Sequence, residues 1–269
     1  MIRCAVTGHT GVLGSKIIKN LPFQFYKFKG DITKFKEVNT WVKAKNFDIF
    51  IHLAAIVPTN EVKRNYKKAY KVNYLGTKNL IKSINQKKIK PKWFFFSSTS
   101  HVYKLTCNLK KLNEKSKIFP STLYGKTKLF AEKELIKNFT NNYPKLCIGR
   151  IFSFTDVKQK KAFVVPSIIF KIKNSKSKIV KFNNLNHFRD FISVSDIVRI
   201  IYKLYKLEKK GIFNLGSGKK INLKDIARYV AKKYNKEVNF VDNEKITYLI
   251  SNNKKIEKIY KKKLSNPFK

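Results

Sequence analysis

The sequence of 269 residues is poor in cysteine, glycine, proline and acidic residues. Its three cysteines, Cys4, Cys107 and Cys147, lie far apart without a CxxC pair, which excludes a disulfide framework and a zinc site. Ten glycines and seven prolines are too few for a collagen-like or low-complexity chain. No apolar run approaches the roughly 18 residues of a membrane helix, and no secretory signal is recognisable. We therefore expect a soluble, cytoplasmic protein without a membrane partner.

Acidic residues are scarce relative to basic ones, because 16 Asp and Glu stand against 60 Lys and Arg, a net charge of +44. Such a charge favours nucleic acid or another polyanion as a partner. Arginine, whose planar guanidinium suits phosphates and bases, occurs at only six positions, which leaves 54 lysines. Together with frequent Asn, Ile, Phe and Tyr, the lysine excess indicates the composition of an AT-rich genome. We therefore do not expect a nucleic-acid partner.

Short apolar segments alternate with helical patterns in the first half of the chain. Residues 2–6, 47–55 and 93–98 read as strands, whereas residues 15–21 and 69–85 carry apolar side chains at helical spacing. This alternation predicts an α/β fold with a Rossmann-type, doubly wound parallel sheet.

The alternation loosens after the apolar segment at 146–152. We therefore predict a dinucleotide-binding domain at 1–156 and a smaller substrate-binding lobe at 157–269, with segments around 189–218 returning to the first domain. Residues 222–234 resemble a capped helix, and the lysine-dense residues 252–269 predict a solvated helix followed by a loose end.

Three glycines occupy the turn between the first strand and the first helix. Gly8, Gly11 and Gly14 form a GxxGxxG pattern, and the absence of side chains lets backbone N–H groups approach a pyrophosphate at a helix N-terminus. A plain structural turn is the alternative reading. The strand before the glycines and the helix after them favour a dinucleotide site.

The second strand of such folds usually ends in an acid that binds the ribose 2′-hydroxyl. Residues 23–29 contain no acid, and Lys27 or Lys29 could instead meet a 2′-phosphate. This favours NADP within an NAD(P) prediction, although a lysine could stand there by chance in so lysine-rich a chain. Asp31 heads the next segment, where it could contact an adenine edge or cap a helix.

Tyr124 and Lys128 are spaced four residues apart and thus share one helix face. A tyrosine with a pKa near 10 is a poor base at neutral pH, and an adjacent ammonium can lower that pKa. Hydroxyls of Ser97, Ser98 and Thr99 follow a predicted parallel strand, at the sheet edge where ligands bind.

In this order and context, the chain resembles the extended short-chain dehydrogenase/reductase family, the NAD(P)-dependent nucleotide-sugar epimerases, dehydratases and reductases. The segments that carry the resemblance follow in the family's order over nearly the whole chain: TGHTGVLG, GDI, HLAA, VNYLGT, FSSTSHVY, YGKTK, RDFISVSD and FNLGSG.

The resemblance implies a role for individual residues. Tyr124 would be the general acid/base, Lys128 would bind ribose and lower the pKa of Tyr124, and Thr99 would hold the reacting oxygen of the substrate. Asn73 would brace the sheet or helix near the site. The implied cofactor-binding residues are Gly8, Thr10, Gly11, Val12, Leu13, Gly14, Asp31, Ile32, Leu53, Ala54, Ala55, Asn73, Tyr124 and Lys128.

The implied substrate-binding residues are Thr99, Ser100, His101, Ser153 and Arg189. Arg189 matches the family's diphosphate contact, with a salt bridge to Asp190 or Asp196 as the alternative. His101 is either a substrate contact or a local hydrogen-bonding group. The other histidines, His9, His52 and His187, show no ligand spacing, so no metal is expected.

Departures from the family pattern narrow the expected reaction. Dehydratases of the family follow the threonine with an Asp-Glu pair, whereas Ser100 and His101 occupy those positions here, so a 4,6-dehydratase is not expected. We favour an NAD(P)-dependent nucleotide-sugar epimerase that transfers hydride at a sugar carbon. One alternative is an NAD(P)H-dependent 4-keto-sugar-nucleotide reductase of the dehydrorhamnose-reductase type. A second is a non-catalytic dinucleotide-binding protein whose basic surface binds a polyanion. The resemblance also implies a homodimer.

Overall fold

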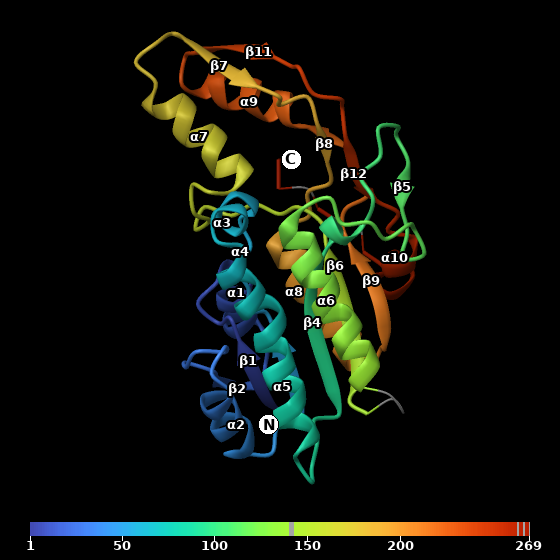
Figure 1. The fold of residues 1–269 in the computed structure, drawn as a ribbon. Coiled ribbons are helices and arrows are strands. Elements are labelled where there is room, and N and C mark those ends of the chain that lie inside the picture. The colour runs from blue at the N-terminus through green and yellow to red at the C-terminus, as the bar shows by residue number, and fades with distance from the viewer. Residues whose placement is uncertain (140–142, 263, 266, 269) are drawn as a thin grey trace.

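The protein, represented by a computed structural model, is described at residues 1–139, 143–262, 264–265 and 267–268. Its centre is a parallel sheet of six strands in the order β2-β1-β3-β4-β6-β9 (Figure 1). These strands are β1 (Arg3–Thr7), β2 (Gln24–Lys27), β3 (Ile49–His52), β4 (Trp93–Thr99), β6 (Lys145–Ile151) and β9 (Gly211–Leu215). The predicted Rossmann-type sheet is confirmed.

Helices cover both faces of this sheet, as the continuous apolar character of its strands requires. One face packs against α1 (Val12–Asn20), α8 (Val194–Lys206) and α10 (Lys254–Tyr260). The other face packs against α2 (Phe35–Lys43), α5 (Gly76–Asn85) and α6 (Leu123–Asn138). Before α5, the chain forms α3 (Thr59–Arg64), α4 (Tyr66–Tyr70) and the π-helical turn η1 (Lys71–Leu75).

A smaller lobe lies beyond the carboxyl ends of the sheet strands (Figure 1). It contains α7 (Val164–Asn174), β7 (Ile179–Asn183), α9 (Leu223–Lys233) and β11 (Glu237–Val241), and the two strands pair in parallel. These elements enclose a separate apolar core. The side chain of Asn222 caps α9 by accepting a hydrogen bond from Lys224 N at 2.9 Å, which confirms the predicted capped helix.

A mixed sheet of four short strands joins the two lobes. Its order is β10-β8-β12-β5, with β10 (Ile221–Asn222), β8 (Phe188–Arg189), β12 (Tyr248–Ser251) and β5 (Lys111–Leu112). Asp190, fully buried just after β8, accepts hydrogen bonds from the backbone N–H groups of Ser217, Gly218 and Ser251 at 2.8–3.0 Å. One carboxylate thus fastens the ends of three chain segments that are distant in the sequence.

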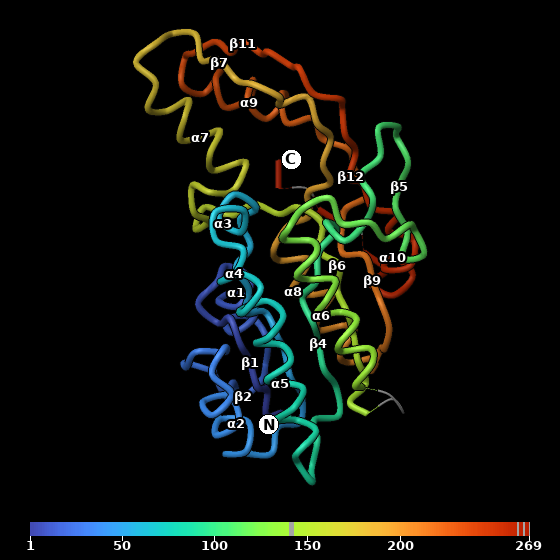
Figure 2. The backbone as a smooth tube through the Cα atoms, in the orientation of Figure 1, coloured from blue at the N-terminus to red at the C-terminus, as the bar shows by residue number. Residues whose placement is uncertain are grey.

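The chain returns to the large sheet after this junction. β9 pairs with β6 and α8 packs beside α1, so segments far apart in the sequence lie side by side (Figure 2). The domain boundary at residue 156 stays a prediction.

The C-terminal segment differs from the solvated helix that its lysine content predicts. Ile256 is fully buried in the sheet-facing core and Leu264 is 3% exposed. The predicted helix is present as α10 with its charged side chains exposed, but its apolar Ile256 packs into the core, because a single apolar side chain can fix one face of a short helix whatever the charge of the other. Residues 263, 266 and 269 of the predicted loose end lie outside the described residues.

Candidate functional site

The glycine turn between β1 and α1 is shaped by close backbone contacts. Gly8 has a φ of +70°, and a Cβ on it would lie 2.6 Å from Ala54 N. A Cβ on Gly14 would lie 2.3 Å from the carbonyl oxygen of Gly8. Side chains at either position are therefore excluded by the packing of the turn itself.

Gly11 has a different environment. An added Cβ would meet only the carbonyl oxygen of Gly8 at 3.4 Å, so packing within the chain does not require a glycine there. Gly11 is the exposed N-cap residue of α1, and this helix has neither a side-chain cap nor an acid in its first turn. The backbone N–H groups at this helix end thus suit an anion such as the pyrophosphate of a dinucleotide. Thr10 is exposed beside it, Val12 is half-buried, and Leu13 is buried.

The segment after β3 lies against the glycine turn. Leu53 and Ala54 each donate a backbone hydrogen bond to Thr7 Oγ1 at 3.3 Å, and Leu53, Ala54 and Ala55 are half-buried. Asn73, fully buried in η1, clamps the same segment through the N–H and carbonyl groups of Ile56 at 2.7 and 3.0 Å. It also donates to Thr127 Oγ1 at 3.0 Å. Asn73 therefore braces this loop against α6, the role that the family resemblance implies.

Asp31 and Ile32 follow β2. Asp31 Oδ1 accepts hydrogen bonds from the N–H and hydroxyl of Thr33 at 2.9 and 2.8 Å, whereas Lys34 is the N-cap of α2. The helix-cap alternative for Asp31 is therefore wrong, and its exposed carboxylate stabilises a local turn. Ile32 is buried beneath Gly76.

Thr99 and Tyr124 meet at the carboxyl end of β4. Thr99 is the last residue of this strand, and Tyr124 lies in the first turn of α6, which Thr122 caps by accepting from Gly125 N at 3.0 Å. A Cβ on Gly125 would lie only 2.2 Å from the carbonyl oxygen of His101. Glycine at this position thus lets α6 approach the loop after β4 closely, and Thr99 lies near enough to Tyr124 to lower the pKa of its phenol.

The electrostatic setting of Tyr124 differs from the one that the Tyr–Lys spacing predicts. Burial raises the pKa of the Tyr124 phenol, and the hydrogen bond with Thr99 lowers it in part. Lys128 is 1% exposed, and its Nζ lies 4.0 Å from the centroid of the Phe96 ring. Burial lowers the pKa of Lys128 to about 7, against the opposing influence of Glu132. An effect of Lys128 on the pKa of Tyr124 stays a prediction.

Ser100 and His101 form, with Val102, the single turn η2 (Ser100–Val102) after Thr99. Ser100 is buried, and the His101 ring stands edge-on to the Tyr124 ring with 5.9 Å between centroids. Ser153 is half-buried, and its N–H donates to the Asp190 carbonyl oxygen at 2.9 Å. Ser153 is thus held by its backbone beside the junction of the lobes.

Arg189 comes from β8, in the sheet that joins the two lobes, and is half-buried. Its Nη1 donates to the carbonyl oxygens of Phe188 and Thr247 at 2.9 and 3.1 Å, and both terminal nitrogens lie 3.2 Å from Thr247 Oγ1. Within the described residues it forms no ion pair, so the predicted salt-bridge alternative is wrong. Burial lowers the pKa of Arg189 to about 10.

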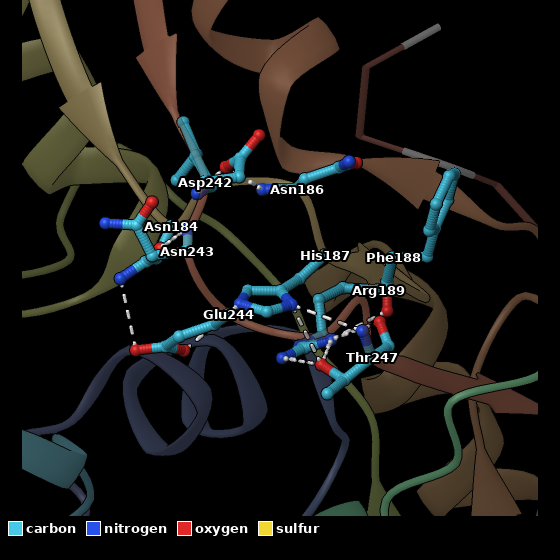
Figure 3. A network of polar contacts seen from close by, with 10 residues as sticks. Asn184, Asn186, His187, Phe188, Arg189, Asp242, Asn243, Glu244 and Thr247 are labelled. Atoms are coloured by element: carbon cyan, nitrogen blue, oxygen red, sulfur yellow. Dashed lines mark hydrogen bonds and ion pairs between the residues drawn. The ribbon is translucent and has the colours of Figure 1, made fainter.

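Residues around Arg189 form a polar network that the sequence analysis missed (Figure 3). Thr247 Oγ1 lies 3.1 Å from His187 Nδ1, and His187 Nε2 lies 3.8 Å from a carboxylate oxygen of Glu244. Thr247 is 58 positions from Arg189, and no local pattern in the sequence marks this pairing.

A second missed network ties α6 to the large sheet. Glu132 accepts hydrogen bonds from Arg150 Nε and Nη2 at 3.0 and 2.7 Å and also one from the Ser98 hydroxyl. All three residues are at most 3% exposed. The sequence indicates that Glu132 shares a helix face with Lys128, because the two are four residues apart. It does not indicate the strand partners of Glu132, which are Ser98 and Arg150.

The described part of the chain lacks two further features, a metal site and a membrane-spanning helix. No group of three or more His, Cys, Asp or Glu side chains is arranged to hold a metal ion. No helix among these residues has the length and apolar character needed to cross a bilayer.

Comparison with known proteins gives consistent similarities. The family model for GDP-mannose 4,6 dehydratase matches residues 7–267. A GDP-6-deoxy-D-talose 4-dehydrogenase from Aggregatibacter actinomycetemcomitans is 29% identical over 228 residues, covering 81% of this chain and 75% of that protein.

Two solved structures share the fold. RMD from Pseudomonas aeruginosa, complexed with NADPH, superposes with a TM-score of 0.86 at 20% identity, covering 98% of this chain and 94% of that one. The UDP-glucose 4-epimerase of Thermus thermophilus, in complex with NAD, gives a TM-score of 0.83 at 19% identity over 96% and 92% of the two chains.

Proposed function

The chain belongs to the extended short-chain dehydrogenase/reductase family, the NAD-dependent nucleotide-sugar epimerases and dehydratases, and we propose that it reduces a 4-keto nucleotide sugar with NAD(P)H. This proposal reverses the order of the two enzymatic candidates that the sequence favours. The observation that carries it is the end of β2, where the exposed Lys27 and Lys29 stand and no acid is present to bind a ribose 2′-hydroxyl. This strand end suits the 2′-phosphate of NADPH, the exchangeable cofactor that a reductase consumes. Burial raises the pKa of the Tyr124 phenol, which agrees with a role as proton donor.

The residues present fit the cofactor. The N-terminus of α1, with Gly11 as its exposed cap residue, would hold the pyrophosphate, and the half-buried Leu53, Ala54 and Ala55 line the adjacent edge of the sheet. A nicotinamide bound there would supply the hydride. The exposed Lys27 and Lys29 at the end of β2, where no acid stands, support NADPH over NADH.

The chain's own residues handle the oxygen of the reacting carbonyl. Tyr124 Oη donates its proton to this oxygen as the keto group becomes a hydroxyl. Thr99 Oγ1, at the end of β4, donates a hydrogen bond to the same oxygen and fixes its position. The uncharged side chains of Ser100 and His101 offer no carboxylate for the elimination of water, which argues against 4,6-dehydration.

Arg189 supports a nucleotide sugar as the substrate. Its guanidinium is bonded only to neutral oxygen atoms in the described chain, and burial disfavours its charge. A diphosphate beside it would supply the missing negative charge in bidentate geometry. The position of Arg189 in the sheet that joins the lobes and of Tyr124 in the first lobe support a substrate that lies between the lobes.

Two observations keep other candidates open. The T. thermophilus epimerase bound to NAD has nearly the same fold, which supports 4-epimerisation as the second candidate. The net charge of +44 supports the non-catalytic, polyanion-binding alternative. The homodimer implied by the resemblance also stays a proposal.

Identification of the retained dinucleotide separates these candidates. The purified protein is denatured and its released small molecules are identified by mass spectrometry. We expect an empty protein that subsequently binds NADPH. Stoichiometric NAD would instead identify an epimerase that recycles its cofactor. Failure to bind either dinucleotide, combined with salt-dependent RNA binding, would favour the non-catalytic alternative.

Replacement of Tyr124 tests the chemistry. We expect Tyr124→Phe to lower the turnover of GDP-4-keto-6-deoxymannose or dTDP-4-keto-6-deoxyglucose by about 10²–10⁴-fold, because general acid catalysis is lost. NADPH affinity should be retained. Turnover is measured as the loss of NADPH absorbance, and Tyr229→Phe, an exposed tyrosine of α9, is the matched control. Unchanged turnover in Tyr124→Phe would remove this residue from the mechanism.

A further inference from the structure

The guanidinium of Arg189 is held by the chain on one side only. Its Nη1 donates to the carbonyl oxygens of Phe188 and Thr247, and both terminal nitrogens lie 3.2 Å from Thr247 Oγ1. Nε and the second N–H of Nη2, which lie side by side, have no partner among the described residues. In Arg150 this same pair of nitrogens binds the Glu132 carboxylate. The edge that Arg189 leaves open is thus the edge that binds an oxyanion.

The Thr247 hydroxyl that holds Arg189 is itself oriented by His187. Thr247 Oγ1 lies 3.1 Å from His187 Nδ1, and the Thr247 N–H donates to the same nitrogen at 3.3 Å. Because an N–H group can only donate, Nδ1 must be the acceptor, and the ring proton is on Nε2. The hydrogen of the Thr247 hydroxyl therefore points to His187, and the lone pairs of Oγ1 face Arg189.

The His187 ring is not needed to hold its own backbone. The His187 N–H donates to the Leu185 carbonyl oxygen at 2.8 Å, and the His187 carbonyl oxygen accepts from Leu223 N at 3.0 Å. Figure 3 shows the imidazole between Thr247 and Glu244, whose carboxylate lies 3.8 Å from Nε2. A substitution of the ring therefore acts mainly on Thr247 and leaves the main-chain bonds of this segment in place.

The charged groups around His187 keep its ring neutral at neutral pH. Burial and then the nearby Arg189 of β8 lower the pKa of His187, against the opposing influence of Glu244 and Asp242 in the segment after β11. Asp242 is also paired with Lys224 of α9. Protonation at lower pH would put a second donor opposite the backbone N–H from which Nδ1 now accepts, and the acceptor that orients the hydroxyl would be lost.

We propose that His187 is a positioning residue of the substrate site: its neutral imidazole orients the Thr247 hydroxyl, which holds Arg189 with its open edge toward the diphosphate of the substrate. The proposal rests on the proposed function for this substrate class. His187 acts through Thr247 and Arg189, so affinity for a nucleotide sugar should follow the protonation of a ring that binds no phosphate itself.

Four variants isolate single atoms of this arrangement. Thr247→Val removes the hydroxyl at nearly constant volume, and Thr247→Ser, its matched control, keeps it. His187→Phe removes both ring nitrogens, whereas His187→Asn keeps an acceptor atom close to the place of Nδ1. Wild type and variants are titrated calorimetrically, in the presence of NADPH, with GDP-mannose, UDP-glucose and dTDP-glucose.

The expected losses have the size of one hydrogen bond. With the sugar nucleotide that wild type binds most tightly, Thr247→Val and His187→Phe should lose about 3–10-fold in affinity. Thr247→Ser and His187→Asn should stay within about 2-fold of wild type. The affinity for NADPH should be unchanged in all four variants, because the dinucleotide site lies at the glycine turn.

The pH profile separates this role from a merely structural one. The diphosphate of a sugar nucleotide stays ionised between about pH 5 and about pH 8, whereas His187 gains a proton as the pH falls through its lowered pKa. Other groups of the site titrate in wild type and in His187→Asn alike. The ratio of the wild-type affinity to the His187→Asn affinity should therefore fall about 2–5-fold from about pH 8 to about pH 5.

Several outcomes would overturn the proposal. Wild-type affinity in Thr247→Val or in a folded His187→Phe would do so, as would equal losses in the Val and Ser variants. A ratio of affinities that is constant or rises toward low pH would exclude the neutral imidazole as the orienting group. Thermal unfolding shows which variants are folded, and if His187→Phe misfolds, the Thr247 pair and the pH profile decide.

Failure of the proposed function is recognised separately. Sugar-nucleotide binding by wild type without NADPH-dependent reduction of GDP-4-keto-6-deoxymannose or dTDP-4-keto-6-deoxyglucose would contradict the proposed function alone. Absence of binding to all three sugar nucleotides by wild type would overturn both proposals.

Discussion

Arg150 is buried and Arg189 is half-buried, and the chain surrounds their guanidinium groups in opposite ways. Arg150, in β6, is 3% exposed and forms two hydrogen bonds with the buried carboxylate of Glu132. Arg189, in β8, bonds only neutral oxygen atoms of Phe188 and Thr247. Accordingly, the pKa of Arg150 is raised by its partner, whereas that of Arg189 is lowered by burial. A buried charge that has an oppositely charged partner in the chain has a structural role, whereas a charge without such a partner is available to bind a ligand.

Helix α6 also carries both a structural residue and a residue of the candidate site. Tyr124, Lys128 and Glu132 are spaced four residues apart on α6 and are all buried. Glu132 meets Ser98 and Arg150 in the balanced cluster, while Tyr124 meets Thr99 in the site. Ser98 and Thr99 are consecutive in β4, and consecutive strand residues point to opposite faces. A shift of one residue on the strand or one turn on the helix thus separates a structural role from a functional one.

Replacement of Arg150 should have the largest effect on stability. In Arg150→Gln the carboxylate of Glu132 stays buried without its cation, and we expect the free energy of unfolding to fall by about 3–5 kcal/mol. Urea denaturation measures this loss. Arg228→Gln is the matched control, because Arg228 pairs with Asp225 at 2.8 Å with both side chains more than half exposed. This variant should lose at most about 1 kcal/mol. Equal losses in the two variants would contradict the distinction.

The arrangement of the site was predictable only where short, local sequence patterns determine it. The six-stranded sheet, the glycine turn, the cap of α9 by Asn222 and the meeting of Thr99 with Tyr124 all follow from short patterns. Parallel strands end at one edge, so residues at their carboxyl ends meet without further information.

The surroundings of each charge were not predictable. The sequence left a salt bridge from Arg189 to Asp190 or Asp196 as the alternative to a diphosphate contact, but Asp190 accepts its hydrogen bonds from Ser217, Gly218 and Ser251. The partner that Arg189 does contact, Thr247, comes from a loop 58 positions later. Pairings of this kind depend on how the second lobe packs, which periodicity and local motifs do not encode. For the same reason the sequence could not indicate that burial dominates the pKa of Tyr124.

Replacement of Lys128 should change stability in the opposite direction. This ammonium is fully enclosed, with the Phe96 ring beside it, so Lys128→Met removes a desolvation cost and keeps the packing. We expect the free energy of unfolding at neutral pH to rise by about 1–3 kcal/mol, while NADPH-dependent reduction is lost. Denaturation and turnover assays measure the two effects. A destabilised variant would place Lys128 among the residues that serve the fold.

The pH dependence of this difference gives an independent check. The pKa of Lys128 is about 7 in the folded protein and about 10.4 in an unfolded chain. Between these values the unfolded state binds more protons, so the wild type gains stability as the pH rises from about 7 to about 10. Lys128→Met lacks this gain, and the stability difference between the two proteins should narrow over that range. A constant difference would contradict the lowered pKa.

Replacement of Arg189 should have the smallest effect on stability and an effect on binding instead. Loss of its hydrogen bonds to neutral oxygen atoms is offset by relief of its desolvation, so we expect Arg189→Gln to change the free energy of unfolding by at most about 1 kcal/mol. Affinity for GDP or UDP, measured by calorimetry, should fall about 10–100-fold because a charge-assisted bidentate contact is lost. Arg199→Gln, an exposed arginine of α8, should retain wild-type affinity. A different outcome would contradict this reasoning: Arg189→Gln could lose as much stability as Arg150→Gln and bind nucleotide normally. The absence of a carboxylate partner would then not identify a ligand-binding arginine, and only the difference in exposure would distinguish Arg150 from Arg189.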